Sequence, residues 1–206
     1  MSKKILFLTG TRADFGKIKS LIQILEAYPE FEPFIFVTGM HLQKEYGYTL
    51  LEVERCGFTN IHTFENHTHE TTMDLTLAKT IKGLSAYVKQ CEPDMIVIHG
   101  DRVEALAGAI VGSLNNILVS HIEGGEVSGT IDELIRHSTS KMSHVHFVSN
   151  KQAKKRLIQM GELENAIFTI GSPDVDIMFS TTLPNLETAK QYYEIAFDTY
   201  AVAMFH

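Results

Sequence analysis

Acidic and basic side chains follow the apolar runs of this sequence, at the points where buried strands would end. Asp101 and Arg102 come directly after MIVIHG, and Glu123 comes directly after ILVSHI. Carboxylates at such positions can transfer protons, because burial raises a carboxyl pKa toward the working range of a general base. A fold needs only turn residues there, so this concentration of charge indicates a site for acid/base chemistry.

The loop GTRADFG, residues 10–16, follows the first apolar run. It lacks the third glycine of G-x-G-x-x-G, so it is a poor match to a dinucleotide site, and it lacks the G-K-[ST] of a P-loop. Its backbone N–H groups, a hydroxyl and the Arg12 guanidinium at a helix N-terminus would suit an anion. The alternative is that Asp14 caps the helix and Arg12 is solvated.

The segment HGDR, residues 99–102, has two compatible interpretations. Asp101 followed by Glu104 fits a capping box if aspartate replaces serine or threonine at the cap. Asp101 at a strand tip could instead act as an acid/base or accept a hydroxyl. One carboxylate oxygen can cap the helix while the other faces a crevice, so both interpretations stay open.

The segment HIEGGEVSGTIDELIR, residues 121–136, combines a strand end with a helix start. Thr130 and Glu133 have the spacing of a capping box, which gives Glu133 a structural role. Asp132 and Arg136 are then left on one helix face, where the plain interpretation is a surface ion pair worth roughly 0.3–0.5 kcal/mol.

Glu123 is harder to explain structurally, because it sits at the end of an apolar strand. We expect burial to raise its pKa toward that of a general base. The two glycines that follow, Gly124 among them, would let the backbone approach a ligand closely.

Histidine pairs raise the question of a metal. His67 with His69, and His144 with His146, are H-x-H pairs, but neither is joined by a cysteine or a convincing third ligand. Cys56 and Cys91 stand in no metal or redox spacing and are expected to be free thiols. We predict no metal, no cofactor and no covalent nucleophile.

The elements that must position these side chains alternate along the chain. Apolar runs predict strands at 3–10, 34–39, 60–64, 95–100, 117–124, 144–150 and 166–173. Helices are predicted at 17–28, 42–57, 71–91, 103–114, 131–142 and 151–161. Several strands are continuously apolar, which is typical of an α/β fold with a parallel sheet covered on both faces. Ligands of such sheets bind at the carboxyl ends of the strands.

The pattern changes after Pro173. We expect a domain over residues 1–173, a helical linker over 174–198, and at 199–206 the first strand of a second domain that the chain does not continue. A further helix-linked strand of the same sheet is the alternative for 199–206.

Composition limits the partners. The chain has 206 residues, with 18 basic and 25 acidic ones and a net charge of −7, which argues against a general nucleic-acid or membrane-surface role. No segment approaches 18 consecutive apolar residues, and MSKKILFL has no apolar region long enough for a signal peptide. We expect a cytoplasmic protein.

Taken together, GTRADFGK, HGDR, HIEGGEVSGTIDELIRH and the strand with GSP at 170–173 resemble the hydrolysing UDP-N-acetylglucosamine 2-epimerases of sialic-acid pathways. The resemblance covers nearly the whole chain. It implies two Rossmann-like domains in the GT-B arrangement, with the active site between them. It also implies anti elimination of UDP through a 2-acetamidoglucal, addition of water, and release of N-acetylmannosamine inverted at C2, with no nicotinamide.

By motif position, the resemblance gives roles to individual residues. Asp101, Glu123 and Asp132 correspond to the acidic catalytic positions, although which of them takes the C2 proton stays open. Substrate contacts are expected from Arg12, Arg136, Gly10 and Gly124. His206 stands where a His-Pro motif would open the second domain, so we include it among the catalytic residues and expect little turnover from this chain alone.

Several alternatives remain. The substrate could be a bacterial UDP-2,4-diacetamido-trideoxyhexose instead of UDP-N-acetylglucosamine. GTRAD in place of the GTRPE usual in non-hydrolysing relatives favours hydrolysis. A GT-B glycosyltransferase or a non-catalytic domain are the other classes, and the family resemblance implies a homo-oligomer.

Overall fold

The computed structural model describes residues 2–67, 72–180 and 183–203, and within them seven parallel strands form one sheet. The strands are β1 (Lys3–Thr9), β2 (Phe31–Val37), β3 (Ile61–Thr63), β4 (Met95–His99), β5 (Leu118–Ile122), β6 (Val145–Val148) and β7 (Ile167–Thr169). Their spatial order is β3-β2-β1-β4-β5-β6-β7. The predicted α/β class and parallel sheet are confirmed.

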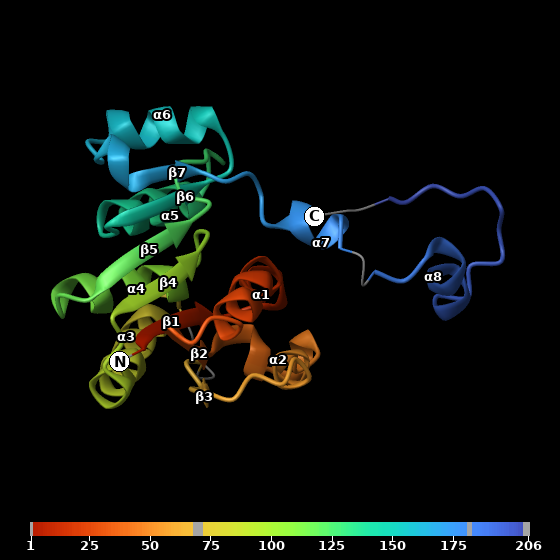
Figure 1. The fold of residues 1–206 in the computed structure, drawn as a ribbon, viewed down its shortest axis with the longest axis horizontal. Coiled ribbons are helices and arrows are strands. Elements are labelled where there is room, and N and C mark those ends of the chain that lie inside the picture. The colour runs from red at the N-terminus through yellow and green to blue at the C-terminus, as the bar shows by residue number, and fades with distance from the viewer. Residues whose placement is uncertain (1, 68–71, 181–182, 204–206) are drawn as a thin grey trace.

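The order of strands reverses in the middle of the sheet, where β1 lies next to β4 (Figure 1). Phe7 of β1 aligns with Val97 of β4 in this parallel pair. A crevice forms outside the carboxyl ends of the strands at such a reversal, and ligands bind there. The loops at 10–11 and 100–102 therefore flank the expected site.

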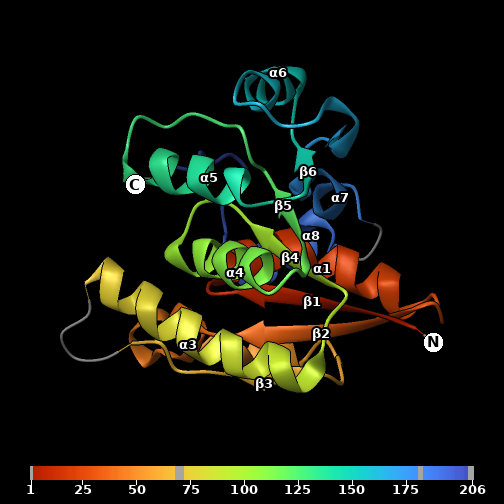
Figure 2. The ribbon, with the colours of Figure 1, turned by 90° about the vertical axis from the view of Figure 1, so that its left-hand side faces the viewer.

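Helices cover both faces of the sheet (Figures 1 and 2). The described α-helices are α1 (Arg12–Glu26), α2 (Leu50–Glu54), α3 (Met73–Cys91), α4 (Val103–Leu114), α5 (Ile131–Lys141), α6 (Lys151–Gln159), α7 (Asp174–Met178) and α8 (Leu186–Tyr192). Ile18 and Ile22 of α1 pack on one face, and Leu84 of α3 and Ala109 of α4 pack on the other. Burial of these apolar side chains fixes the layers.

Helix α1 begins five residues before its predicted start. Thr11 accepts a hydrogen bond from the backbone N–H of Asp14, and the Asp14 carboxylate accepts one from the backbone N–H of Thr11. This capping box satisfies N–H groups that a helix otherwise leaves unpaired, so the helix can start at Arg12. The capping interpretation of Asp14 is confirmed.

The helix predicted over 42–57 is mostly wrong. Only Leu50–Glu54 is α-helical, and two short 3-10 turns precede it. Gly47 and Tyr48 have φ angles of +86° and +48°, and two consecutive left-handed residues interrupt a right-handed helix.

The C-terminal part leaves the layered domain after β7 (Figure 1). Helix α7 contacts α1, while α8 lies away from the sheet. Residues 199–203 form no strand, and 204–206 lie outside the described residues, so the proposed start of a second domain stays a prediction. Within the described part of the chain, no helix is long and apolar enough to cross a membrane.

Candidate active site at the carboxyl edge of the sheet

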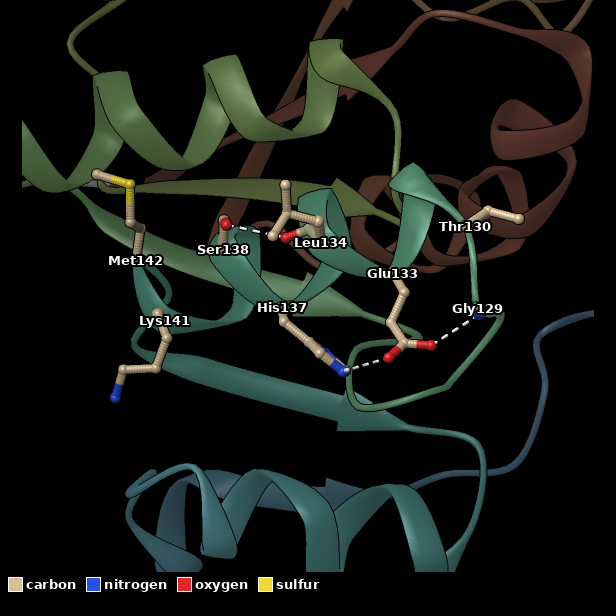
Figure 3. A pocket seen from close by; sticks show the side chains of 8 residues that line it. All are labelled: Gly129, Thr130, Glu133, Leu134, His137, Ser138, Lys141 and Met142. Atoms are coloured by element: carbon tan, nitrogen blue, oxygen red, sulfur yellow. Dashed lines mark hydrogen bonds and ion pairs between the residues drawn. The ribbon is translucent and has the colours of Figure 1, made fainter.

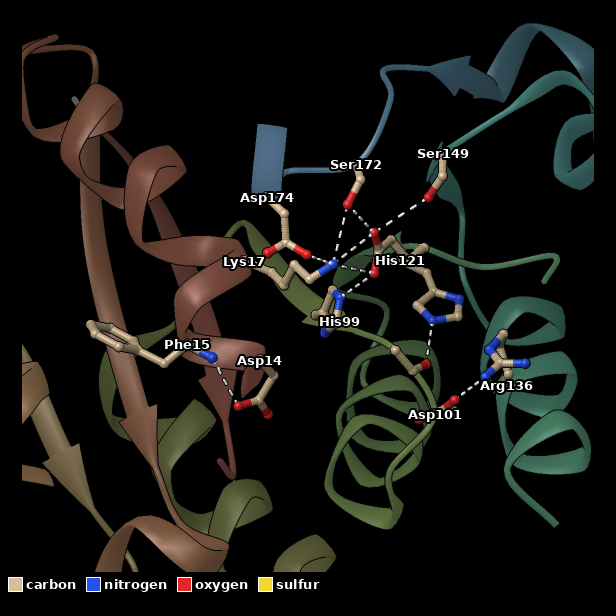
Figure 4. A network of polar contacts seen from close by, with 12 residues as sticks. Asp14, Phe15, Lys17, His99, Asp101, His121, Arg136, Ser149, Ser172 and Asp174 are labelled. Carbon is tan, nitrogen blue, oxygen red and sulfur yellow. Dashed lines mark hydrogen bonds and ion pairs between the residues drawn. The ribbon is translucent and has the colours of Figure 1, made fainter. Parts of the chain in front are cut away.

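Glu123 follows β5 and is the centre of a polar cluster drawn from several elements. Figure 4 labels its partners Lys17, His99, Ser149 and Ser172. Its Oε2 lies 2.8 Å from Nε2 of His99, at the end of β4. Its Oε1 accepts hydrogen bonds from Lys17 of α1 at 3.1 Å and from Ser172 at 2.9 Å. Ser149, after β6, approaches the same oxygen at 3.4 Å. The fold therefore gathers four donors around one carboxylate.

The expected raised pKa of Glu123 is wrong. Burial does raise the pKa, but hydrogen bonds and charges from His99, Ser172 and Lys17 outweigh burial and lower it to about 2. The group is consequently an ionised carboxylate at neutral pH, held by its donors. Glu123 also has a φ angle of +60°, which is uncommon for a residue with a side chain and is typical of functional sites.

Lys17 links Glu123 to the start of α7. Its Nζ lies 2.7 Å from Oδ2 of Asp174 and 3.2 Å from Oγ of Ser172. The Lys17 side chain is only 18% exposed, so its charge is poorly screened by solvent. Burial lowers the pKa of Lys17, but its bonds to Asp174 and Glu123 outweigh burial and raise that pKa, so the lysine stays charged.

Asp101 pairs with Arg136, which projects from α5 (Figure 4). Arg136 is buried and also donates to the carbonyl of Glu126 at 3.1 Å. The plain interpretation of Arg136 as a surface partner of Asp132 is wrong, because its guanidinium turns inward to Asp101. Asp101 does not cap α4: Arg102 occupies the N-cap position, and its side chain makes no capping hydrogen bond.

Glu133 does not form the predicted capping box with Thr130. Its Oε2 accepts hydrogen bonds from the backbone N–H groups of Ser128 and Gly129, at 2.7 and 2.8 Å. The loop before α5 curls so that these groups precede the cap position. Glu133 still has a structural role, and Oδ2 of Asp132 accepts a hydrogen bond from Oγ1 of Thr130 at 3.1 Å.

A pocket of about 280 Å³ brings Asp101 and Asp132 together. Its other lining residues are His67, Met73, Thr76, Arg102, Val103 and Glu104. Arg102 Nε donates to Oε2 of Glu104 at 3.2 Å, and the Glu104 side chain is only 2% exposed. A buried carboxylate thus fixes an arginine at the wall of the pocket.

The first loop uses most of its N–H groups internally. The backbone N–H groups of Gly10, Thr11 and Phe15 all donate to the Asp14 carboxylate. Arg12 is 73% exposed at its side chain and lies 3.9 Å from Glu52. The expected anion site in this loop is therefore filled by the protein's own aspartate, and substrate contacts by Arg12 and Gly10 stay predictions.

Gly124 is required by close packing. A Cβ there would lie 2.7 Å from Oγ of Ser140 and 2.8 Å from Nδ1 of His121. His121 is completely buried, and its Nε2 lies 2.7 Å from the carbonyl of Gly100. Burial lowers the pKa of His121 to about 3, so the ring is neutral. The glycine brings the backbone close to the protein's own side chains, and a ligand contact stays a prediction.

A larger pocket, of about 600 Å³, lies along α5 (Figure 3). Its lining includes Glu133, Leu134, His137, Lys141 and Met142, and none of the predicted catalytic residues. Size alone therefore does not identify the site here. The described residues hold no group of three potential metal ligands, and His69 and His206 lie outside them.

Sequence reasoning missed five residues of the Glu123 cluster: Lys17, His99, Ser149, Ser172 and Asp174. Lys17 ends the quoted stretch GTRADFGK, and Ser172 and Asp174 belong to GSPD. Each ends a strand, follows one or lies in the helix after it, and this placement was the available signal. Their convergence on Glu123 required the sheet order.

Most of the chain matches a known protein family. Residues 23–206 match the family described as UDP-N-acetylglucosamine 2-epimerase. That match covers most of the chain. The chain belongs to this family.

Relatives of this chain include bacterial proteins named as 2-epimerases. It is 52% identical over 204 residues to "UDP-N-acetylglucosamine 2-epimerase" of Neisseria meningitidis, covering 99% of the chain and 54% of that protein. It is 37% identical to "UDP-N,N'-diacetylbacillosamine 2-epimerase (hydrolyzing)" of Legionella pneumophila, covering 94% and 52%. The chain spans about half the length of these curated relatives and corresponds to their N-terminal half.

Solved structures support the fold of this epimerase family. The UDP-GlcNAc 2-epimerase of Methanocaldococcus jannaschii, in complex with UDP-GlcNAc and UDP, matches with a TM-score of 0.80 at 25% identity. The match covers 93% of this chain and 54% of that one. A galactosyltransferase, WaaB, matches with a TM-score of 0.59 at 14% identity, which concerns the fold alone. The predicted place in the first half of a GT-B-like arrangement is confirmed.

Proposed function

We propose that this chain supplies the N-terminal half of a hydrolysing UDP-N-acetylglucosamine 2-epimerase, which releases UDP and N-acetylmannosamine. The observation that carries the proposal is the set of three carboxylates at one edge of the sheet. Asp101 and Asp132 line one pocket, and Glu123 is held ionised beside β4. The 52% identity to the Neisseria protein favours the same reaction.

The chemistry needs a group that takes the C2 proton and a cation that stabilises the departing diphosphate. Arg102 and Arg136 are each fixed by a carboxylate near the pocket. Arginine held in one orientation loses less conformational entropy when it binds a phosphate than a free side chain does. Elimination passes through a 2-acetamidoglucal, and water then adds to it.

The size of the pocket lined by Asp101 and Asp132 suits only part of a UDP-sugar. Small-molecule sites usually enclose about 300–1,000 Å³, and the Asp101 pocket encloses about 280 Å³. A whole UDP-sugar therefore needs further walls. We infer that the half of the relatives' length that this chain does not span supplies them, together with most contacts to the uridine, and that this chain alone turns over weakly.

The test uses proton NMR in D₂O with UDP-N-acetylglucosamine. The chain is measured alone and joined to the C-terminal half of the Neisseria relative, which we call the joined protein. We expect the joined protein to release UDP and N-acetylmannosamine deuterated at C2, and the chain alone to be nearly silent. An intact UDP-N-acetylglucosamine signal with the joined protein would count against this substrate.

A second substrate has a specific observation in its favour. Relatives at 37% and 36% identity are named as diacetylbacillosamine 2-epimerases. A panel including a UDP-2,4-diacetamido-trideoxyhexose separates the two substrates.

A glycosyltransferase shares only the fold, and it would require an acceptor for turnover. Inactivity toward every UDP-sugar would favour a non-catalytic domain, and light scattering tests the predicted homo-oligomer.

A further inference from the structure

We propose that His99, oriented by Glu123, is the base that takes the proton from C2 of the sugar in this reaction. The inference rests on the proposed function and adds a residue that family membership does not assign. Glu123 Oε2 lies 2.8 Å from Nε2 of His99, and the ionised carboxylate can only accept a hydrogen bond. Nε2 must therefore carry the hydrogen, and a neutral ring has its lone pair at Nδ1.

That second nitrogen is available. Within residues 2–67, 72–180 and 183–203, no group forms a hydrogen bond with Nδ1 of His99. Nδ1 is not among the fully buried side-chain atoms that lack a partner, so it is partly exposed. The His99 side chain is 12% exposed, so the ring is fixed in place while one edge stays open. A basic nitrogen with a fixed direction and an open edge can receive a proton from a ligand.

The neighbouring candidates are less suited to that role. Glu123 has donors from Lys17, Ser172 and Ser149 as well as His99, so few of its lone pairs are free. The buried His121 has contacts at both ring nitrogens, to Gly100 and to a serine of α5. Only His99 combines a carboxylate partner with an open nitrogen among these described groups.

The position of His99 also fits. It is the last residue of β4, two residues before Asp101, which lines the small pocket. Lys17 from α1 and Asp174 from α7 are the other charges around the Glu123 cluster, and they pair with each other at 2.7 Å. The carboxylate of Glu123 is therefore the charge that a protonated His99 would contact directly.

The proton balance is simple. The C2–H bond breaks, its proton goes to Nδ1 of His99, and its electron pair forms the C1–C2 double bond. The bond from C1 to the diphosphate oxygen breaks, and that electron pair leaves with UDP. Glu123 stabilises the imidazolium without becoming protonated, as a carboxylate does beside a catalytic histidine. The imidazolium then returns its proton to solvent.

Replacement of His99 in the joined protein tests the role. We expect His99→Ala to lower kcat/KM by about 10²–10⁴-fold, with UDP affinity changed less than threefold. Added imidazoles should restore part of the rate, in proportion to their basicity. His62→Gln is the matched control, because His62 stacks on Tyr87 at the far edge of the sheet. Wild-type turnover in His99→Ala, or rescue independent of basicity, would overturn the proposal.

The ring itself gives a second readout in the chain as it exists. Long-range proton–nitrogen NMR should show the Nε2–H tautomer of His99, with a lone pair at Nδ1. An Nδ1–H tautomer would overturn the proposal, because no acceptor would face the sugar. Failure of the two ideas is distinguishable: an inactive wild-type joined protein removes the epimerase function, whereas an active His99→Ala variant removes only the role of His99.

Discussion

Two carboxylates in this molecule, Asp14 and Glu123, each accept several hydrogen bonds, but from different parts of the chain. The donors to Asp14 are Thr9, Gly10, Thr11 and Phe15, all within five residues. The donors to Glu123 lie from 24 to 106 residues away. A carboxylate whose hydrogen-bond donors lie nearby in sequence shapes a loop. A carboxylate whose donors come from four distant elements depends on the whole fold, and Glu123 lies at the carboxyl edge of the sheet, where we propose the active site.

Removal of the charge at Glu123 should have the largest effect. We expect Glu123→Gln to lower kcat/KM of the joined protein by about 10²–10⁴-fold, because His99 loses its charged partner. UDP release measures the rate. Asp14→Asn is the matched control and should lose less than tenfold. A greater loss from Asp14→Asn would reverse the comparison between the two carboxylates.

Lowering the pH should reduce the stability of the fold in two steps, first through His121 and then through Glu123. His121 has a folded pKa of about 3, below its ordinary 6.5, so unfolding takes up a proton and stability falls as pH drops from 6.5 toward 3. Glu123 has a folded pKa of about 2 against an ordinary 4.5. It contributes roughly 3 kcal/mol above pH 4.5, and this is lost as pH falls through 2.

Urea unfolding of the chain between pH 7.5 and 3 measures this dependence. Burial also lowers the pKa of His41 and of His146, which act in the same direction as His121. A free energy of unfolding that stays constant from pH 7.5 to 4 would show that these histidines are not buried as neutral rings.

Loss of the Asp14 carboxylate should mainly affect stability. Asp14→Ala leaves the backbone N–H groups of Gly10 and Thr11 without their carboxylate acceptor, and we expect a loss of about 2–3 kcal/mol in the free energy of unfolding. Denaturant titration of the chain measures it. An unchanged free energy of unfolding in Asp14→Ala would show that these N–H groups find other acceptors without the carboxylate.

The smallest effect is expected at the rim of the Glu123 cluster. Asp174 is 45% exposed at its side chain, and Lys17 keeps Glu123 and Ser172 as partners without it. Asp174→Asn should therefore change the free energy of unfolding by less than about 1 kcal/mol. Thermal unfolding checks this value. A larger change would show that the start of α7 is part of the functional cluster.

Local patterns predicted the strands and most helices well. Helix α4 spans Val103–Leu114 as expected, because its apolar spacing and flanks are unambiguous. Capping was less predictable: Thr11 caps α1, whereas Thr130 does not cap α5. The side chain of Glu133 binds N–H groups before the cap position, and sequence spacing does not show how a loop curls.

The sequence by itself determined the α/β class, the edge of the sheet that carries the charged residues, and the positions of Asp101, Glu123 and Asp132. Only the tertiary structure decided that Arg136 pairs with Asp101 and that His99, Lys17 and Ser172 meet at Glu123. It also reversed the expected pKa shift of Glu123. Burial can be inferred from an apolar run, but the donors that stabilise a buried charge come from other strands and helices, and their approach depends on sheet order.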